Sequence, residues 1–179
     1  MKIISGIYKN RSLKSPNSTK THPMGNREKI ALFNILQPYL RDAHVLDAFA
    51  GTGALGLEAL SRGAQSATFI EKSPKIAQTL RENIQEIAKD RIDNIHLITK
   101  PATEAALLLA DQHFDIIIAD PPYDHFLIND ITPLANLLSN NGIFVLSHPD
   151  ASAPLFSEKL TLIKTRAYAA AHLSFYQKA

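Results

Sequence analysis

The sequence predicts an α/β domain over residues 25–179, with a mostly parallel sheet and helices on both of its faces, after a short extension over residues 1–24. Strand patterns and helix patterns alternate along the chain, which is typical of repeated βα units. Residues 116–119, Ile-Ile-Ile-Ala, have no polar alternation, as expected for a strand covered on both faces. A glycine-rich turn at residues 51–56 joins the first strand candidate to the next helix candidate.

The extension is expected to carry a basic hairpin and a loop. Residues 2–5 and 11–13 have the pattern of a short hairpin, and residues 15–23 are rich in Ser, Asn, Thr, Lys and Pro, which is typical of a mobile loop. Residues 1–41 contain eight basic residues and one acid, a net charge of +7, whereas the rest of the chain carries −5. This segregation indicates a surface that binds a polyanion, although a solvated basic surface would explain a charge run alone equally well.

The elements of the domain follow in order from their periodicities. A helix is expected over residues 27–40, with Asn26 as its N-cap residue. Gly63 and Pro74 mark the end of one later helix and the start of another. The expected strands are residues 44–49, 67–71, 95–98, 114–119 and 142–147, and the helices between them are 54–62, 74–89, 102–110 and 127–138. Residues 160–168 and 172–177 are expected to add an antiparallel hairpin, which makes a sheet of seven strands.

The segment LDAFAGTGALG, residues 46–56, has the spacing G-x-G-x-x-G at Gly51, Gly53 and Gly56. It lies between a strand and a helix, the Rossmann-like context in which this pattern binds nucleosides, since glycine lets a ligand approach a sharp backbone turn. Glu71 ends the second strand, where a carboxylate can accept hydrogen bonds from ribose hydroxyls. The segment therefore predicts a nucleoside ligand, with a purely structural glycine turn as the alternative.

Asp47 favours one class of nucleoside ligand over another. A carboxylate at the tip of the first strand would repel the pyrophosphate of a dinucleotide, but it suits a ligand that carries an amino group and a sulfonium. The sequence therefore favours S-adenosylmethionine as the cofactor. An oxidoreductase that uses a nicotinamide cofactor is the competing interpretation of the glycine pattern.

A second motif, Asp120-Pro121-Pro122-Tyr123, follows the apolar strand directly. The prolines cannot continue a strand ladder and form a stiff loop at the edge of the sheet where α/β proteins bind ligands. The Asp120 carboxylate and the Pro121 carbonyl can accept hydrogen bonds from the exocyclic amine of a nucleobase, and Tyr123 can stack on the base. Methyl transfer to such an amine depends mainly on positioning and electrostatics. A Pro-Pro strand terminator with a surface tyrosine is the structural alternative.

Several classes of site are not expected. The chain has no cysteine, which excludes disulfides, thiolate zinc sites and cysteine nucleophiles. Its seven histidines show no helical i, i+4 pair, and no metal is expected. No apolar stretch has the length of a signal peptide core or a membrane span, so a cytoplasmic location without membrane contact is expected.

The segments LDAFAGTGALGLEALSRGA and DPPY, together with IISGIYKNRSL, REKIALFNIL and LSFY, occur in this order along nearly the whole chain. In these segments the chain resembles the RsmD family of bacterial small-subunit (16S) ribosomal RNA guanine-N2 methyltransferases. The resemblance implies a class I methyltransferase fold, S-adenosylmethionine as methyl donor and the exocyclic N2 amine of a guanine as acceptor, with a role in rRNA processing. It also implies small-subunit rRNA as partner, free or within a small subunit, and a monomer is expected.

The resemblance and the motifs together identify the expected site residues. Catalysis is assigned to the loop Asp120, Pro121, Pro122 and Tyr123. Cofactor binding is assigned to Asp47, Phe49, Ala50, Gly51, Gly53, Glu71, Lys72 and Ala102. RNA binding is assigned to Lys9, Arg11, Lys14 and Arg27. The family usually has an acid after the third strand that contacts adenine, and this chain has Pro101 and Ala102 there, so that contact is expected to be absent or to move to Thr103 or Glu104.

Other functions fit parts of the same pattern. The closest is an amino methyltransferase with a different acceptor, such as adenine N6 in DNA or RNA, and a glutamine amide acceptor is less favoured because Asn is usual there in place of Asp120. A nicotinamide-dependent oxidoreductase would give the Asp-Pro-Pro-Tyr loop no role. A non-catalytic RNA-binding assembly factor would keep the fold and the basic extension without the chemistry.

Overall fold

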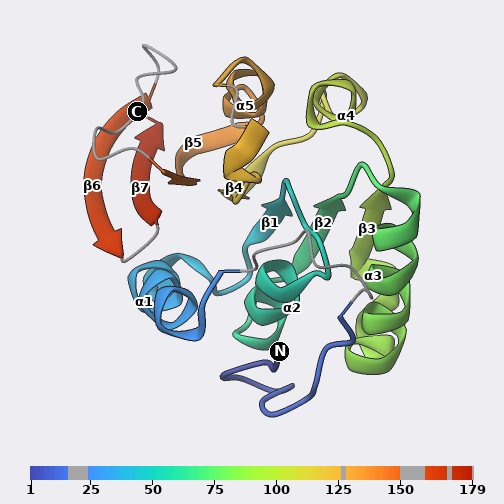
Figure 1. Ribbon diagram of the computed structural model, residues 1–179. Coiled ribbons are helices and arrows are strands. Elements are labelled where there is room, and N and C mark those ends of the chain that lie inside the picture. The colour runs from blue at the N-terminus through green and yellow to red at the C-terminus, as the bar shows by residue number, and fades with distance from the viewer. Residues whose placement is uncertain (16–23, 126–127, 150–159, 169–170, 179) are drawn as a thin grey trace.

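Seven strands form one sheet in the order β3-β2-β1-β4-β5-β7-β6. The computed structural model describes residues 1–15, 24–125, 128–149, 160–168 and 171–178 (Figure 1). The strands are β1 (His44–Asp47), β2 (Ser66–Ile70), β3 (Ile95–Ile98), β4 (Phe114–Ala119), β5 (Leu138–His148), β6 (Leu160–Tyr168) and β7 (Ala171–Lys178). The first five pair in parallel, and β7 pairs antiparallel with both β5 and β6. The predicted mostly parallel sheet with a C-terminal antiparallel hairpin is confirmed.

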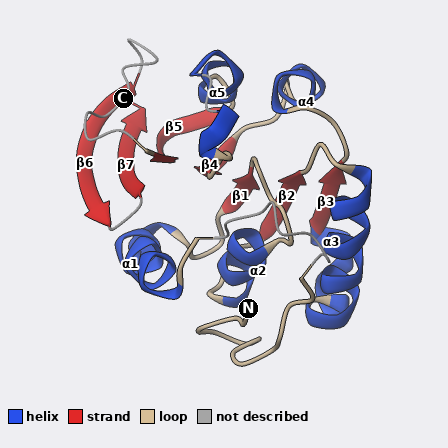
Figure 2. Ribbon diagram, viewed as in Figure 1, coloured by secondary structure: helices blue, strands red, loops and turns tan. Residues whose placement is uncertain are grey.

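Helices cover both faces of this sheet (Figure 2). They are α1 (Asn26–Leu36), α2 (Ala54–Ser61), α3 (Pro74–Ile87), α4 (Ala102–Leu108) and α5 (Ile128–Ala135). One face packs against α1, α2 and α3 through two apolar clusters, and the other packs against α4 and α5 through one. The central strands β1 and β4 contribute side chains to clusters on both faces, which explains their lack of polar alternation. In the described residues, no helix combines the length and the apolar character needed to cross a bilayer.

Some predicted boundaries are wrong, for local reasons. Gly25 is the N-cap residue of α1 in place of Asn26, and its amide donates to the Glu28 carboxylate at 2.6 Å. The helix expected over residues 127–138 spans only Ile128–Ala135, because Pro133 removes a backbone donor near its end and Leu138 already begins β5. From residue 16 onward, the loop expected at 15–23 lies outside the described residues.

Residues 1–15 pack on the domain and do not extend away from it. The expected hairpin pairing is present as the bridge between Lys2 and Ser12, with the Ile3 amide donating to the Arg11 carbonyl at 3.0 Å. Ile3, Tyr8 and Leu13 are buried in the same core as α2 and α3. Figure 1 shows this segment, in dark blue, at the ends of those two helices.

Glu58 of α2 is a buried carboxylate that holds the extension in place. Its oxygens accept hydrogen bonds from the backbone amides of Ile4 at 2.7 Å and Ser5 at 3.0 Å. Two cations balance its charge, with Arg62 Nε at 2.8 Å and Lys29 Nζ at 3.6 Å. A buried charge is tolerated only when it is paired and hydrogen-bonded, and all of these partners are needed to satisfy this one.

The end of α2 makes a second attachment next to Glu58. Gly6 has φ +82°, and a Cβ atom there would lie 1.7 Å from the carbonyl oxygen of Ser61. That oxygen accepts a hydrogen bond from the Ile7 amide at 2.9 Å, and the Ser61 hydroxyl accepts one from the Tyr8 amide, also at 2.9 Å. Only glycine permits this close backbone contact.

Glu58→Gln should lower the free energy of unfolding by about 2–4 kcal/mol, because it leaves the buried cations Lys29 and Arg62 without their counter-charge. Urea denaturation measures the loss. Glu104→Gln is the control, since it removes only the exposed pair with Lys100, worth about 0.5 kcal/mol or less. Equal losses for the two variants would contradict the role given to Glu58.

Candidate functional site

The candidate site lies where three neighbouring parallel strands end. Asp47 is the last residue of β1, Asp120 directly follows β4, and Ser147 is the penultimate residue of β5. Because β1, β4 and β5 pair in parallel, their carboxyl ends share one edge of the sheet. Ala119 pairs with Leu146, so Asp120 and Ser147 are the next neighbours beyond that pair.

The glycines of the turn after β1 have two different roles, close packing and an open backbone surface. Gly51 and Gly53 have φ +52° and +84°, where a side chain would be strained. A Cβ atom on Gly53 would lie 2.4 Å from Leu80, and one on Gly56 would lie 2.3 Å from Phe69, so these two glycines allow α2 to pack closely. No described protein atom lies within 4 Å of a Cβ atom built on Gly51. Gly51 therefore forms the side of the turn that a ligand can approach.

Asp47 lies beneath this turn with only 1% of its surface exposed. Its Oδ2 accepts a hydrogen bond from the Gly56 amide at 2.8 Å, in the first turn of α2. Its Oδ1 is buried without a hydrogen-bond partner in the described part of the chain. The pKa of Asp47 is raised to about 7, chiefly by burial and also by the carboxylates of Asp120 and Glu71, against the lowering effect of the Gly56 amide.

Glu71 holds the glycine turn against the end of β2. Its carboxylate accepts hydrogen bonds from the Gly51 amide at 3.0 Å and the Ser73 amide at 2.8 Å. Burial raises the pKa of Glu71, and the two amides oppose this rise. A carboxylate offers about four lone-pair sites, so Glu71 can still accept hydrogen bonds from ribose hydroxyls.

The Asp-Pro-Pro-Tyr segment turns away from the sheet at the end of β4. Asp120 and Tyr123 are partly exposed, Pro121 is buried and Pro122 is exposed. Burial raises the pKa of Asp120 to about 6, while the hydrogen bond from Ser147 lowers it and the charge of Glu28 raises it. Asp120 is thus a carboxylate that is mostly ionised near neutral pH, although its surroundings disfavour its charge.

Ser147 and Glu28 are site residues that the sequence analysis missed. The Ser147 hydroxyl lies 2.5 Å from the Tyr123 hydroxyl. It is also close enough to the Asp120 carboxylate for hydrogen bonding to lower the pKa of that group. Glu28, in the first turn of α1, is close enough to raise the pKa of both Asp120 and Tyr123. Neither residue belongs to a motif, and only the pairing of β4 with β5 and the packing of α1 bring them here.

The other expected cofactor residues also follow strand ends. Phe49 is partly buried against the core beneath α4 and α5, and Ala50 is buried against α2 and α3. Lys72 is exposed after β2, and Ala102 is the buried first residue of α4, after β3. All four therefore belong to the same edge of the sheet as Asp47.

The four basic residues expected at the RNA surface are all exposed, and they are Lys9, Arg11, Lys14 and Arg27. Arg11 donates to the Ile87 carbonyl at 2.5 Å, at the carboxyl end of α3. Lys14 forms ion pairs with two glutamates of α3, Glu82 at 3.3 Å and Glu86 at 3.2 Å. Arg11 and Lys14 therefore attach the extension to α3, a role that the charge pattern did not reveal.

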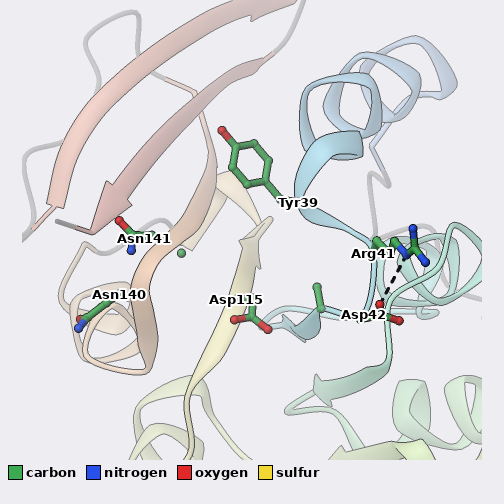
Figure 3. Close-up of a pocket in the computed structure, with 8 residues that line it drawn as sticks. Tyr39, Arg41, Asp42, Asp115, Asn140 and Asn141 are labelled. Atoms are coloured by element: carbon green, nitrogen blue, oxygen red, sulfur yellow. Dashed lines mark ion pairs between the residues drawn. The ribbon is translucent and has the colours of Figure 1, made fainter.

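A separate polar hollow lies at the opposite edge of the sheet (Figure 3). Its lining residues are Tyr39, Arg41, Asp42, Ala43, Asp115, Asn140, Asn141 and Gly142. They precede β1, begin β4 or lie in the first part of β5, so they are at the amino ends of the parallel strands. No residue of the candidate site lines this hollow.

Comparison with known proteins gives close relatives over the whole chain. The sequence matches the family described as Conserved hypothetical protein 95 over residues 1–177. It is 32% identical to "Ribosomal RNA small subunit methyltransferase D" of Haemophilus influenzae, across 99% of this chain and 93% of that protein. It is 37% identical to the protein of the same name from Escherichia coli K12, across 79% of this chain and 68% of that protein.

The fold is similarly close to solved structures. A structure described as "Putative methyltransferase yhhF from Escherichia coli" superposes with a TM-score of 0.84 at 30% identity, covering 99% of this chain and 97% of that one. The chain therefore has the Rossmann-like class I methyltransferase fold that the sequence predicts.

Asp47→Asn should make the protein more stable than the wild type as the pH rises. The folded protein holds the Asp47 proton more tightly than the unfolded chain does, so ionisation between about pH 4 and pH 7 lowers the free energy of unfolding. The variant should gain on the order of 4 kcal/mol relative to the wild type between about pH 4 and about pH 8.

Urea denaturation of both proteins at the two pH values measures this gain. Asp42→Asn is the matched control, because the Asp42 side chain is exposed and its positive φ suits asparagine. At either pH it should change the free energy of unfolding by about 0.5 kcal/mol or less, since it removes only an exposed ion pair with Arg41. A pH-independent difference for Asp47→Asn would show that Asp47 does not titrate as described.

Proposed function

This chain belongs to the Conserved hypothetical protein 95 family, and we propose that it transfers a methyl group from S-adenosylmethionine to the N2 amine of a guanine in small-subunit rRNA. The observation that carries the proposal is the convergence of the buried, half-satisfied Asp47 and the Asp120 loop at adjacent strand ends. The relatives named "Ribosomal RNA small subunit methyltransferase D" support the substrate class. Their names do not state which atom is methylated, and guanine N2 is part of the proposal.

The residues around the glycine turn fit S-adenosylmethionine. Among the described residues, one buried oxygen of Asp47 has no hydrogen-bond partner, and Asp120 and Glu71 add further negative charge. A ligand with an ammonium and a sulfonium would lower the pKa values that these carboxylates raise in one another. The donor, when bound, supplies an electrophilic methyl group on a positively charged sulfur.

The same geometry disfavours a dinucleotide. In dinucleotide sites the pyrophosphate binds the free amides at the start of the helix after the glycine turn. Here the Asp47 carboxylate already accepts the Gly56 amide in that helix turn, and its charge would oppose the phosphates. The nicotinamide-dependent oxidoreductase is therefore the less favoured alternative.

The residues of the Asp-Pro-Pro-Tyr loop would bind and orient the acceptor. Asp120 and the Pro121 carbonyl accept the two N–H bonds of the exocyclic amine, which turns its lone pair toward the methyl group. Tyr123 supports the base by stacking, worth about 1–3 kcal/mol. The methylated amine is strongly acidic, so its proton leaves readily, and Asp120 need act only as an electrostatic partner.

The buried attachments of residues 1–15 suggest how RNA is held. The Glu58 network fixes the extension on the domain, so its exposed cations would present one rigid basic surface next to α3. We place Lys9 and Arg27 in direct contact with RNA phosphates and treat residues 1–24 as the RNA-contacting extension of the domain 25–179. Arg11 and Lys14 would contribute charge while they remain attached to α3.

The product of the reaction tests the proposed function. The protein is incubated with labelled S-adenosylmethionine and either free rRNA or small subunits, and the RNA is digested to nucleosides. Label should appear in N2-methylguanosine, and Asp120→Asn should reduce its rate of formation about 100-fold or more while RNA affinity stays near that of the wild type. Label in N6-methyladenosine would overturn the acceptor, and nicotinamide cofactor binding without methyl transfer would favour the oxidoreductase.

Lys9→Ala and Arg27→Ala should each weaken RNA binding and reduce the dependence of log K on log salt by about one unit, because each removes one phosphate contact. Binding titrations over a range of salt concentrations measure this slope. Arg41→Ala is the control, since Arg41 is an exposed cation that belongs neither to the extension nor to α1. An unchanged slope for Lys9→Ala would remove that residue from the RNA surface.

A further inference from the structure

We infer that Ser147 is a positioning residue for the methyl acceptor, which holds the Asp120 carboxylate and the Tyr123 ring in one arrangement through a directed chain of hydrogen bonds. This inference rests on the proposed function and adds a residue that belongs to none of its motifs. Ser147 lies in β5, a strand that the sequence analysis gave no chemical role.

The contacts of Ser147 place it between the two groups that would hold the base. Its side chain is buried, with 2% of the residue exposed. Its Oγ lies 2.5 Å from the Tyr123 hydroxyl. The same hydroxyl neighbours the Asp120 carboxylate and lowers the pKa of that group by hydrogen bonding. The pairing of Ala119 with Leu146 fixes this proximity, because Asp120 and Ser147 are the next residues on their strands.

The chemistry of the three groups fixes the direction of the chain. An ionised carboxylate only accepts hydrogen bonds, and a serine hydroxyl has one proton to donate. With the Ser147 proton directed to Asp120, Tyr123 is the donor in the 2.5 Å bond to Ser147, which is the arrangement that we infer. A tyrosine that only stacked on a base would need no such partner.

This direction has two consequences for the acceptor site. The bond to Ser147 restricts the Tyr123 ring to one orientation before the base arrives, which lowers the entropy cost of stacking. The bond from Ser147 occupies one lone pair of Asp120 and leaves the others for the amine. Hydrogen bonds to a charged group are among the stronger ones, and chains of them reinforce one another.

The charges around Asp120 make this bond important for its ionisation. Asp47 faces it from β1 and Glu28 from α1, and both disfavour a second negative charge. Tyr123, from its own loop, is neutral and is tied to Ser147. His148, the residue after Ser147, hydrogen bonds to Ser174 on β7. Ser147 is thus the hydrogen-bond donor that favours the ionised form of Asp120.

Four variants separate this role from a structural one. Ser147→Ala removes both bonds, Ser147→Thr keeps the hydroxyl, and Tyr123→Phe removes only the phenolic donor. Ser174→Ala is the matched control, because Ser174 is a buried serine on the adjacent strand β7 that hydrogen bonds to His148 and Thr165. Thermal unfolding of each variant shows the stability cost of losing a buried hydroxyl.

The first measurement does not depend on catalysis. Carbon-detected NMR of the side-chain carboxyls, assigned with Asp120→Asn, follows the titration of Asp120 in the free protein. Ser147→Ala should raise the pKa of Asp120, Ser147→Thr should restore it, Tyr123→Phe should raise it less, and Ser174→Ala should leave it unchanged. An Asp120 titration that is the same in Ser147→Ala and the wild type would overturn the inference, even if the protein proves to have another activity.

The second measurement is methyl transfer by the wild type and the same variants. Ser147→Ala should lower kcat about tenfold, move the acid limb of the pH profile to higher pH and leave the Kd for S-adenosylmethionine unchanged. Combining it with Tyr123→Phe should lower kcat little further than Ser147→Ala does, since both changes break one chain. Two results would show that Ser147 has only a structural role. One is a fully additive loss of kcat in the double variant, and the other is an equal loss of kcat in Ser174→Ala and Ser147→Ala.

Discussion

The parallel pairing of β1, β4 and β5 is the constraint on which the rest of the site depends. Each strand is buried on both faces, and parallel pairing brings the three carboxyl ends to one edge. Asp47, Asp120 and Ser147 come from distant parts of the chain and meet only because of this pairing. The loops after the strands can then hold a donor and an acceptor next to each other without any further domain.

The parallel pairing of these strands also brings several carboxylates together at a buried edge of the sheet, where water solvates them poorly. Asp47, Glu71 and Asp120 are all held with raised pKa values, chiefly because burial disfavours their ionised forms. Backbone amides at the start of α2 and after β2 offset part of this cost. The remaining electrostatic strain is what a cationic ligand relieves, so a feature that lowers the stability of the free protein would strengthen binding of the donor.

Glu58 on α2 differs from these site carboxylates, because its charge is balanced by cations and its oxygens accept hydrogen bonds. Glu58 accepts two backbone amides of the extension and pairs with Lys29 and Arg62, so the first residues of the chain belong to the domain core. The basic character of the extension is evident from composition. Which of its cations are already engaged, such as Arg11 at the end of α3, follows only from packing.

The sequence by itself determined the order and type of the elements, the glycine turn and the Asp-Pro-Pro-Tyr loop, because these depend on local periodicity and on residues with special backbone properties. It also predicted Asp47 as a cofactor-binding residue, because this acid lies just before the recognisable glycine turn. It missed Ser147 and Glu28, and it did not indicate that Gly53 and Gly56 allow close packing against Leu80 and Phe69. Those roles come from contacts between residues distant in the sequence, which only the tertiary structure decided, because the pairing of strands and the packing of helices leave no local signal at a single serine, glutamate or glycine.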